Sequence, residues 1–137
     1  MFATKPQLEP DPQKNPTTDW VLRIGVALFF FAVGIEKFSH NPKSEWMTIF
    51  ARVGWGDWFR YFTGVVETLG GVLMLVPKTT LVGTGLLASA MLGAILAHLL
   101  VLGDPFSSAI PLVLLVLIVV IGWKLSRKPE EFTHLKL

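Results

Sequence analysis

Three ionisable side chains stand out because each lies inside, or at the end of, a long apolar stretch of the sequence. They are Lys37, Glu67 and His98. An ionisable group inside a bilayer is costly unless it is protonated or paired, so by default it marks a candidate functional site. A carboxylate and an imidazole are suited to proton exchange with a bound molecule. We therefore take these three residues as candidate ligand-binding residues, and we assign no catalytic residue.

Glu67 shares one helical face with small residues. The positions three and four residues away on either side are Thr63, Gly64, Gly70 and Gly71. Small residues let helix backbones approach closely in membranes, so this face should meet other helices and Glu67 should point into a bundle. The alternative to a functional site is that Glu67 is only a polar contact between two helices.

The composition predicts a protein whose solvent is lipid. The chain has 137 residues, of which 52% are hydrophobic and only 16% are charged, which argues against a soluble globule. It contains no cysteine, so disulfides and cysteine-ligated zinc are excluded. The net charge of +2 is spread without a basic stripe, so we expect a lipid bilayer and no nucleic acid as partner.

Four apolar stretches predict membrane-spanning helices at residues 20–38, 58–76, 81–102 and 108–123. Each is close to the length that crosses about 30 Å of hydrocarbon. The turns after the second and third stretches are short, so neighbouring helices should be antiparallel. The predicted fold is an all-α membrane protein, a four-transmembrane-helix up-down bundle.

The long connection between the first two spans predicts an amphipathic interfacial helix. Asn41 and Pro42 have the form of a helix start, and Gly54 that of a helix end. Between them, apolar residues recur at helical spacing: Trp46, Ile49, Phe50 and Val53. Trp55 and Trp58 follow at once, which favours the membrane interface. The helix would anchor the bundle, which we favour, or cover its end.

The other spans also have distinct faces. In the first span, one face carries Arg23, Ala27, Phe30, Gly34 and Lys37. We expect that face to be packed, with Arg23 near the helix end extending its charged group to the interface. In the third span, a row of small residues predicts a packed face: Gly85, Ser89, Gly93 and Ala97. The fourth span has no polar interior residue, so it should be the most lipid-exposed.

The composition of the two chain ends predicts a tail on each side of the membrane domain. Residues 1–19 contain four prolines among polar residues and should form a disordered tail, residues 20–124 the membrane domain, and residues 125–137 a short basic tail.

Four membrane spans put both termini on one side of the membrane. That side carries the larger set of cations, in the middle turn and after the last span, so we expect both termini in the cytoplasm.

This orientation brings the three candidate residues together. Lys37 and His98 lie near the outer ends of their helices, and Glu67 lies roughly 13 Å inward from the outer end of its own. Because side chains lean toward the N-terminus of their helix, the three should converge. We expect an ion pair between Lys37 and Glu67, with His98 hydrogen-bonded to it. The sequence contains no metal or flavin motif.

These residues, in this order and spacing, resemble the DoxX family. The resemblance lies in Arg23 with Gly34-x-x-Lys37, in Thr63-Gly64-x-x-Glu67-x-x-Gly70-Gly71, and in a small-residue-rich third span that ends at His98. It covers about residues 20–124. It implies a four-helix fold and a place in the bacterial inner membrane. Family members are associated with thiosulfate:quinone oxidoreductase or terminal quinol oxidase complexes, others with assemblies that respond to oxidative stress, and distant eukaryotic relatives with chaperones.

Three functions are compatible with these features. The favoured one is a small membrane subunit of a quinone-linked oxidoreductase, in which Lys37, Glu67 and His98 receive quinone as substrate. Such a subunit carries no electrons itself, so a protein partner in a membrane complex would supply them. The alternative is a membrane chaperone or assembly scaffold with no catalysis of its own. The third is a small-solute transporter, which no pair of broken helices supports.

Overall fold

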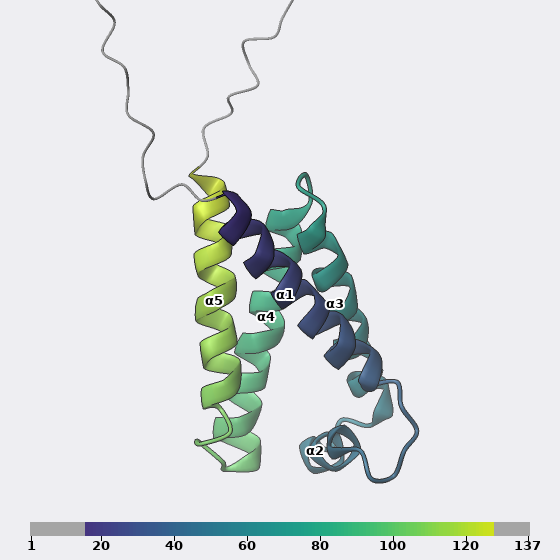
Figure 1. Ribbon diagram of the computed structural model, residues 1–137. Coiled ribbons are helices and arrows are strands. Elements are labelled where there is room, and N and C mark those ends of the chain that lie inside the picture. The colour runs from purple at the N-terminus through teal and green to yellow at the C-terminus, as the bar shows by residue number, and fades with distance from the viewer. Residues whose placement is uncertain (1–15, 128–137) are drawn as a thin grey trace, which may run out of the picture.

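The computed structural model describes residues 16–127, which form an all-helical domain without a strand in that range (Figure 1). The helices are α1 (Pro16–Glu36), α2 (Glu45–Val53), α3 (Asp57–Leu75), α4 (Thr80–Leu96) and α5 (Ala109–Ser126). A π-helical segment, η1 (Ala97–Leu102), continues α4. The parts of the two predicted tails at 1–15 and 128–137 lie outside the described residues.

Three of these helices are long and apolar enough to cross a membrane: Thr17–Glu36, Thr80–Leu102 and Ala109–Ser126. Their mean hydropathies are 1.7, 2.2 and 2.4. The second predicted span corresponds to α3, which is helical over 19 residues but contains the charged residues Asp57, Arg60 and Glu67. By length and composition alone, α3 does not qualify as a span.

The first helix begins one turn before the predicted start at residue 20, because Pro16 belongs to it. Proline is well tolerated in a first turn, where its missing N–H would have no intrahelical partner. Asp19 also lies in this turn, where a negative charge interacts favourably with the helix dipole.

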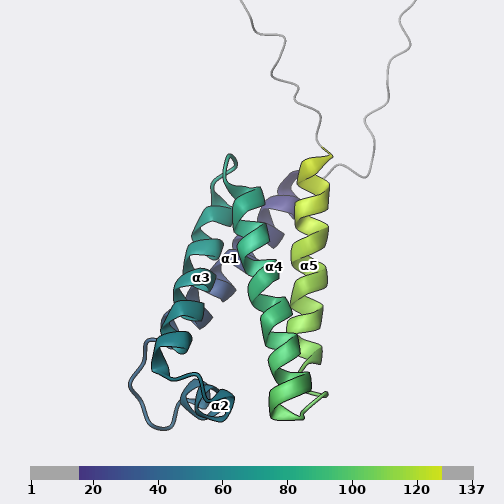
Figure 2. The same ribbon diagram turned by 180° about the vertical axis from the view of Figure 1, so that it is seen from behind.

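The helices lie side by side in the order α1, α3, α4, α5, with each antiparallel to the next (Figures 1 and 2). The start of α1 and the end of α5 lie at one end, together with the α3–α4 turn. We call this the terminal end, where Lys124 Nζ is 3.5 Å from Asp19 Oδ1. The α2 end, opposite, holds α2 and the α4–α5 turn. Toward the α2 end, α3 and α4 diverge in both views.

The α1–α3 pair packs through glycines. A Cβ atom on Gly34 would lie 2.8 Å from the carbonyl oxygen of Gly64, and one on Gly64 would lie 2.8 Å from that of Gly34. A Cβ on Gly71 would lie 2.8 Å from the oxygen of Ala27. The two backbones are therefore too close for any side chain at these positions. The predicted packed face of α1 is confirmed, since all five of its residues are buried.

The apolar core lies between α1, α3, α4 and α5. Its buried members are Val26, Phe30, Met74, Leu87, Met91, Ile118 and Ile121. Most of α5 is exposed, as expected of a lipid-facing helix, but Ile118 and Ile121 give it one packed face.

The predicted packing role of the small-residue row on the third span is wrong for this chain by itself. Gly85, Ser89 and Gly93 are exposed, and a Cβ on either glycine would meet nothing within 4 Å. The close contact is made by Gly83 instead, where a Cβ would lie 2.7 Å from the oxygen of Gly70. Small residues occur on more than one face of α4, so spacing alone could not identify the face that meets α3.

The amphipathic helix starts later than predicted. It begins at Glu45, and the side chain of Asn41 accepts a hydrogen bond of 3.0 Å from the N–H of Lys43, which makes a local turn instead of a cap. Gly54 ends the helix as predicted, with φ 77° and its N–H donating to the oxygen of Phe50. Gly56, with φ 84°, lies just before α3 and also requires the left-handed region.

Candidate functional site

The structure places Lys37 and Glu67 in direct contact. Lys37 Nζ donates to Glu67 Oε2 at 2.6 Å, and only 4% and 5% of the two side chains are exposed. Lys37 lies just after the last turn of α1, while Glu67 is central in α3. The close approach of Gly34 and Gly64 brings the two helices near enough for this contact, since a Cβ on Gly64 would be 3.2 Å from Lys37 Cβ.

Two rings from α2 cover the ion pair. Lys37 Nζ lies 4.5 Å from the ring centroid of Trp46 and 5.7 Å from that of Phe50, which places the ammonium over the negative faces of both rings. Yet α2 itself has no buried residue. The sequence favoured a helix that anchors the bundle over one that covers its end; the structure places two rings of this helix over the ion pair.

The cover is also attached to η1. Arg52 Nη2 donates to the carbonyl oxygen of Leu102 at 3.1 Å, which joins the last turn of α2 to the last residue of the π-helix. This hydrogen bond connects α2 with η1 at the α2 end, where α3 and α4 have diverged from one another (Figure 2). A helix with no buried side chain is thus held by two cation–π contacts with Lys37, the hydrogen bond from Arg52, a contact between the rings of Phe50 and Phe59, and its chain connections.

Arg60 closes the C-terminal end of α1. It is only 1% exposed, and its Nη1 donates to the carbonyl oxygens of Lys37 and, at 2.9 Å, Ser39. Carbonyls at the end of a helix have no intrahelical donor and need such a partner. Arg60 was not among the residues that the sequence singled out. The available signal was its position in the first turn of α3, directly beside the end of the antiparallel α1.

His98 is not brought into the pair. The described residues offer no hydrogen bond between its ring and Lys37 or Glu67, and its Nδ1 is buried without a hydrogen-bond partner. The prediction assumed a regular α-helix through Leu102 that stays beside α3. Instead, His98 lies in η1, where its carbonyl accepts N–H groups from Gly103 and Asp104, and α4 has diverged from α3.

Arg23 caps the C-terminal end of α3, as Arg60 caps that of α1. Its Nη2 donates to the carbonyl oxygen of Met74 at 2.8 Å and to Thr80 Oγ1 at 2.6 Å. The side chain is 6% exposed and stacks on Trp20, 4.6 Å from the ring centroid. The expectation that Arg23 extends to the interface is wrong, because the end of α3 provides an acceptor inside the protein.

The Lys37–Glu67 pair could serve a ligand with a carbonyl or hydroxyl group. Lys37 can donate to a carbonyl oxygen, and Glu67 can accept a proton or hydrogen bond, provided that the rings of Trp46 and Phe50 move aside. Within residues 16–127, no cluster of three or more histidine and carboxylate side chains could hold a metal ion.

A family model described as DoxX-like family matches residues 21–121. The match begins in α1, ends in α5, and includes Lys37, Arg60, Glu67 and His98. Neither the curated proteins nor the solved structures gave a match to this chain.

Proposed function

The chain belongs to the DoxX-like family and is an integral membrane protein; from that premise we propose that it is the small membrane subunit of a quinone-linked redox complex. The observation that carries the proposal is the buried Lys37–Glu67 pair beneath the rings of Trp46 and Phe50. Charge pairs within membrane helices are rare and tend to mark pathways or ligand sites.

In this proposal α3 is the fourth span. Its Arg60 and Glu67 are buried against polar partners, while its outward residues are apolar: Phe62, Val65, Leu69 and Val72. Nineteen helical residues extend over roughly 28 Å, which matches the hydrocarbon thickness. The charges of Arg60 and Glu67 therefore do not face lipid, and the exposed Asp57 is the first residue of the helix.

The amphipathic α2 would lie in the interface on the outer side of the inner membrane, with the exposed Trp55 and Trp58 at head-group depth. Both termini would then be cytoplasmic. A cysteine at Ser126 should resist an impermeant thiol reagent in intact cells, and one at Thr48 should react. Both positions are exposed, and the chain has no cysteine of its own. The opposite labelling pattern would contradict the orientation.

The head group of a quinone would replace the rings of Trp46 and Phe50 beside the pair. Reduction of the quinone to the quinol takes up two electrons and two protons. Lys37 would donate one proton to the carbonyl oxygen that it binds, and Glu67 would take up a proton from water and pass it to the other oxygen. The two electrons must come from a partner protein that carries a redox cofactor. His98, which lies in η1 away from the pair, takes no part in this scheme.

The test is a neutral double substitution, Lys37→Met with Glu67→Gln, in protein purified gently from its own membrane. If the pair is the quinone site, this variant should stay folded but lose copurified quinone and partner-dependent quinone reduction. A matched control is Asp19→Asn with Lys124→Gln, which removes the exposed ion pair at the other end and should retain both. Full quinone content in the first variant would refute the site.

A second function, that of an assembly scaffold, is favoured by one observation: every charge of the pair is already satisfied within the protein. In that case the pair would set the register of α1 against α3. The same double variant would then be stable and fully active in cells, and gentle purification would yield an unrelated client protein instead of a redox partner.

A further inference from the structure

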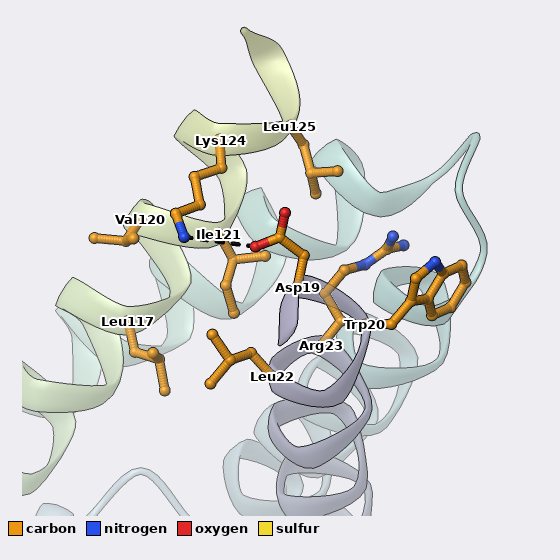
Figure 3. Close-up of a pocket in the computed structure, with 9 residues that line it drawn as sticks. All are labelled: Asp19, Trp20, Leu22, Arg23, Leu117, Val120, Ile121, Lys124 and Leu125. Carbon is orange, nitrogen blue, oxygen red and sulfur yellow. Dashed lines mark hydrogen bonds and ion pairs between the residues drawn. The ribbon is translucent and has the colours of Figure 1, made fainter. Parts of the chain in front are cut away.

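A crevice separates α1 from α5 at the terminal end (Figure 3). Its volume is about 40 Å³, and its walls are apolar, with Leu22 facing Leu117 and Ile121. Asp19 and Lys124 face one another across its mouth. The two helices meet at this end and contact each other little elsewhere, because α1 diverges from α5 away from the crevice.

Positive charge at this crevice is not balanced within the described residues. Arg23 lines the wall and is 6% exposed, yet its hydrogen-bond acceptors are a neutral carbonyl and a neutral hydroxyl, and its Nε is buried without a partner. Lys124 adds a second cation at the mouth of the crevice, and Arg127 adds a third at the same end of α5 but outside the crevice lining. The carboxylate of Asp19 is the one acidic group that residues 16–127 place at this end.

The contact between Lys124 and Asp19 is weak enough for Lys124 to bind another anion instead. At 3.5 Å it is long for an ion pair, and about half of the Lys124 side chain is exposed. Exposed pairs of this kind contribute little to stability, so exchanging the partner costs little.

One tryptophan, Trp20, lines the crevice, and a second, Trp123, lies near the same end of α5 outside the lining. Trp20 and Trp123 are 43% and 54% exposed, and Arg127 is stacked 3.9 Å from the ring centroid of Trp123. Aromatic residues beside cations at a helix end are typical of the membrane interface, and basic pockets between spanning helices bind anionic lipid head groups.

We propose that this crevice binds one anionic phospholipid. The phosphodiester accepts a hydrogen bond from Lys124 Nζ and supplies negative charge to an end of the molecule where the described cations outnumber the one carboxylate. One acyl chain lies against Leu22 and Leu117 and continues into the opening between α1 and α5. This site is independent of the Lys37–Glu67 pair, which lies toward the opposite end.

The experiment uses the full chain in detergent, with phosphatidylglycerol or phosphatidylcholine added in mixed micelles and bound lipid counted by native mass spectrometry. Phosphatidylglycerol should be retained in preference to phosphatidylcholine. Lys124→Gln should weaken that retention about fivefold, as expected for one cation near a lipid surface. The matched control, Lys78→Gln, removes an exposed cation at the same end but outside the crevice and should change nothing.

A second variant tests the walls without changing charge. Leu117→Trp should fill the crevice and reduce phosphatidylglycerol retention while the melting temperature stays close to that of the parent protein. Equal retention of both lipids, or equal losses in Lys124→Gln and Lys78→Gln, would overturn the proposal, because the attraction would then be apolar or a general surface field. Stabilisation by inorganic phosphate alone would also overturn it.

Discussion

The two ends of the α1–α3 pair use the same device but differ in what surrounds it. At each end, an arginine of one helix caps the carboxyl end of the other: Arg60 closes α1, and Arg23 closes α3. Only the α2 end adds the Lys37–Glu67 pair and its aromatic cover. Because the terminal end holds together without such a pair, capping does not require one. The comparison therefore separates the structural arginines from the pair that is a candidate for function.

The largest expected effect comes from breaking the pair on one side only. Lys37→Met leaves a buried carboxylate and Glu67→Gln a buried ammonium, each of which should lower the free energy of unfolding by about 3–5 kcal/mol. The double variant should lose much less. Melting in detergent measures all three, and the non-additivity gives the coupling. Additive losses would mean that the two side chains do not act as a pair.

A smaller effect should come from removing either cap. Arg60→Gln leaves two carbonyls short of a donor and Arg23→Gln leaves one carbonyl and one hydroxyl, with about 1–3 kcal/mol lost per buried group. We expect comparable melting losses at the two ends. A much larger loss for Arg60 would show that the cap and the Lys37–Glu67 pair are one coupled unit.

The aromatic cover should contribute less again. Trp46→Leu removes the nearer ring and should cost about 1 kcal/mol, and Phe50→Leu should cost less because its ring is farther from the ammonium. Both leave the cap by Arg60 intact. The measurement is melting combined with amide exchange in α2, which should become faster. Unchanged exchange would show that the rings do not hold this helix in place.

The smallest effect contrasts two glycines of α4. Gly93→Ala should be neutral or raise stability by up to about 1 kcal/mol, since its Cβ meets nothing and alanine favours helix. Gly83→Ala should lower it by about 1–3 kcal/mol through overpacking against α3. A large loss for Gly93→Ala in the native membrane would instead mean that another helix covers that face there.

Sequence periodicity predicted the helices, because helical spacing is visible within each stretch. It also predicted the Lys37–Glu67 pair, because the same spacing identified the buried face of each of the two helices that carry it. The buried faces of α1 and α3 follow from residues three and four apart, and Lys37 and Glu67 follow from those faces. The cap by Arg60 was missed, because its acceptors are main-chain atoms of another helix and spacing within α3 does not reveal them. His98 was misplaced because the π-helical turn and the divergence of α4 leave no mark in the apolar pattern.

The reciprocal caps also bear on how the chain enters the membrane. Each helix of the α1–α3 pair carries charges whose partners are on the other, so neither partitions well into lipid alone. We expect α1 to remain at the translocation machinery until α3 has been synthesised, and the two to enter lipid together as a hairpin. The second acceptor of Arg23 is Thr80, the first residue of α4, so the hairpin is complete only once the ribosome has passed that position.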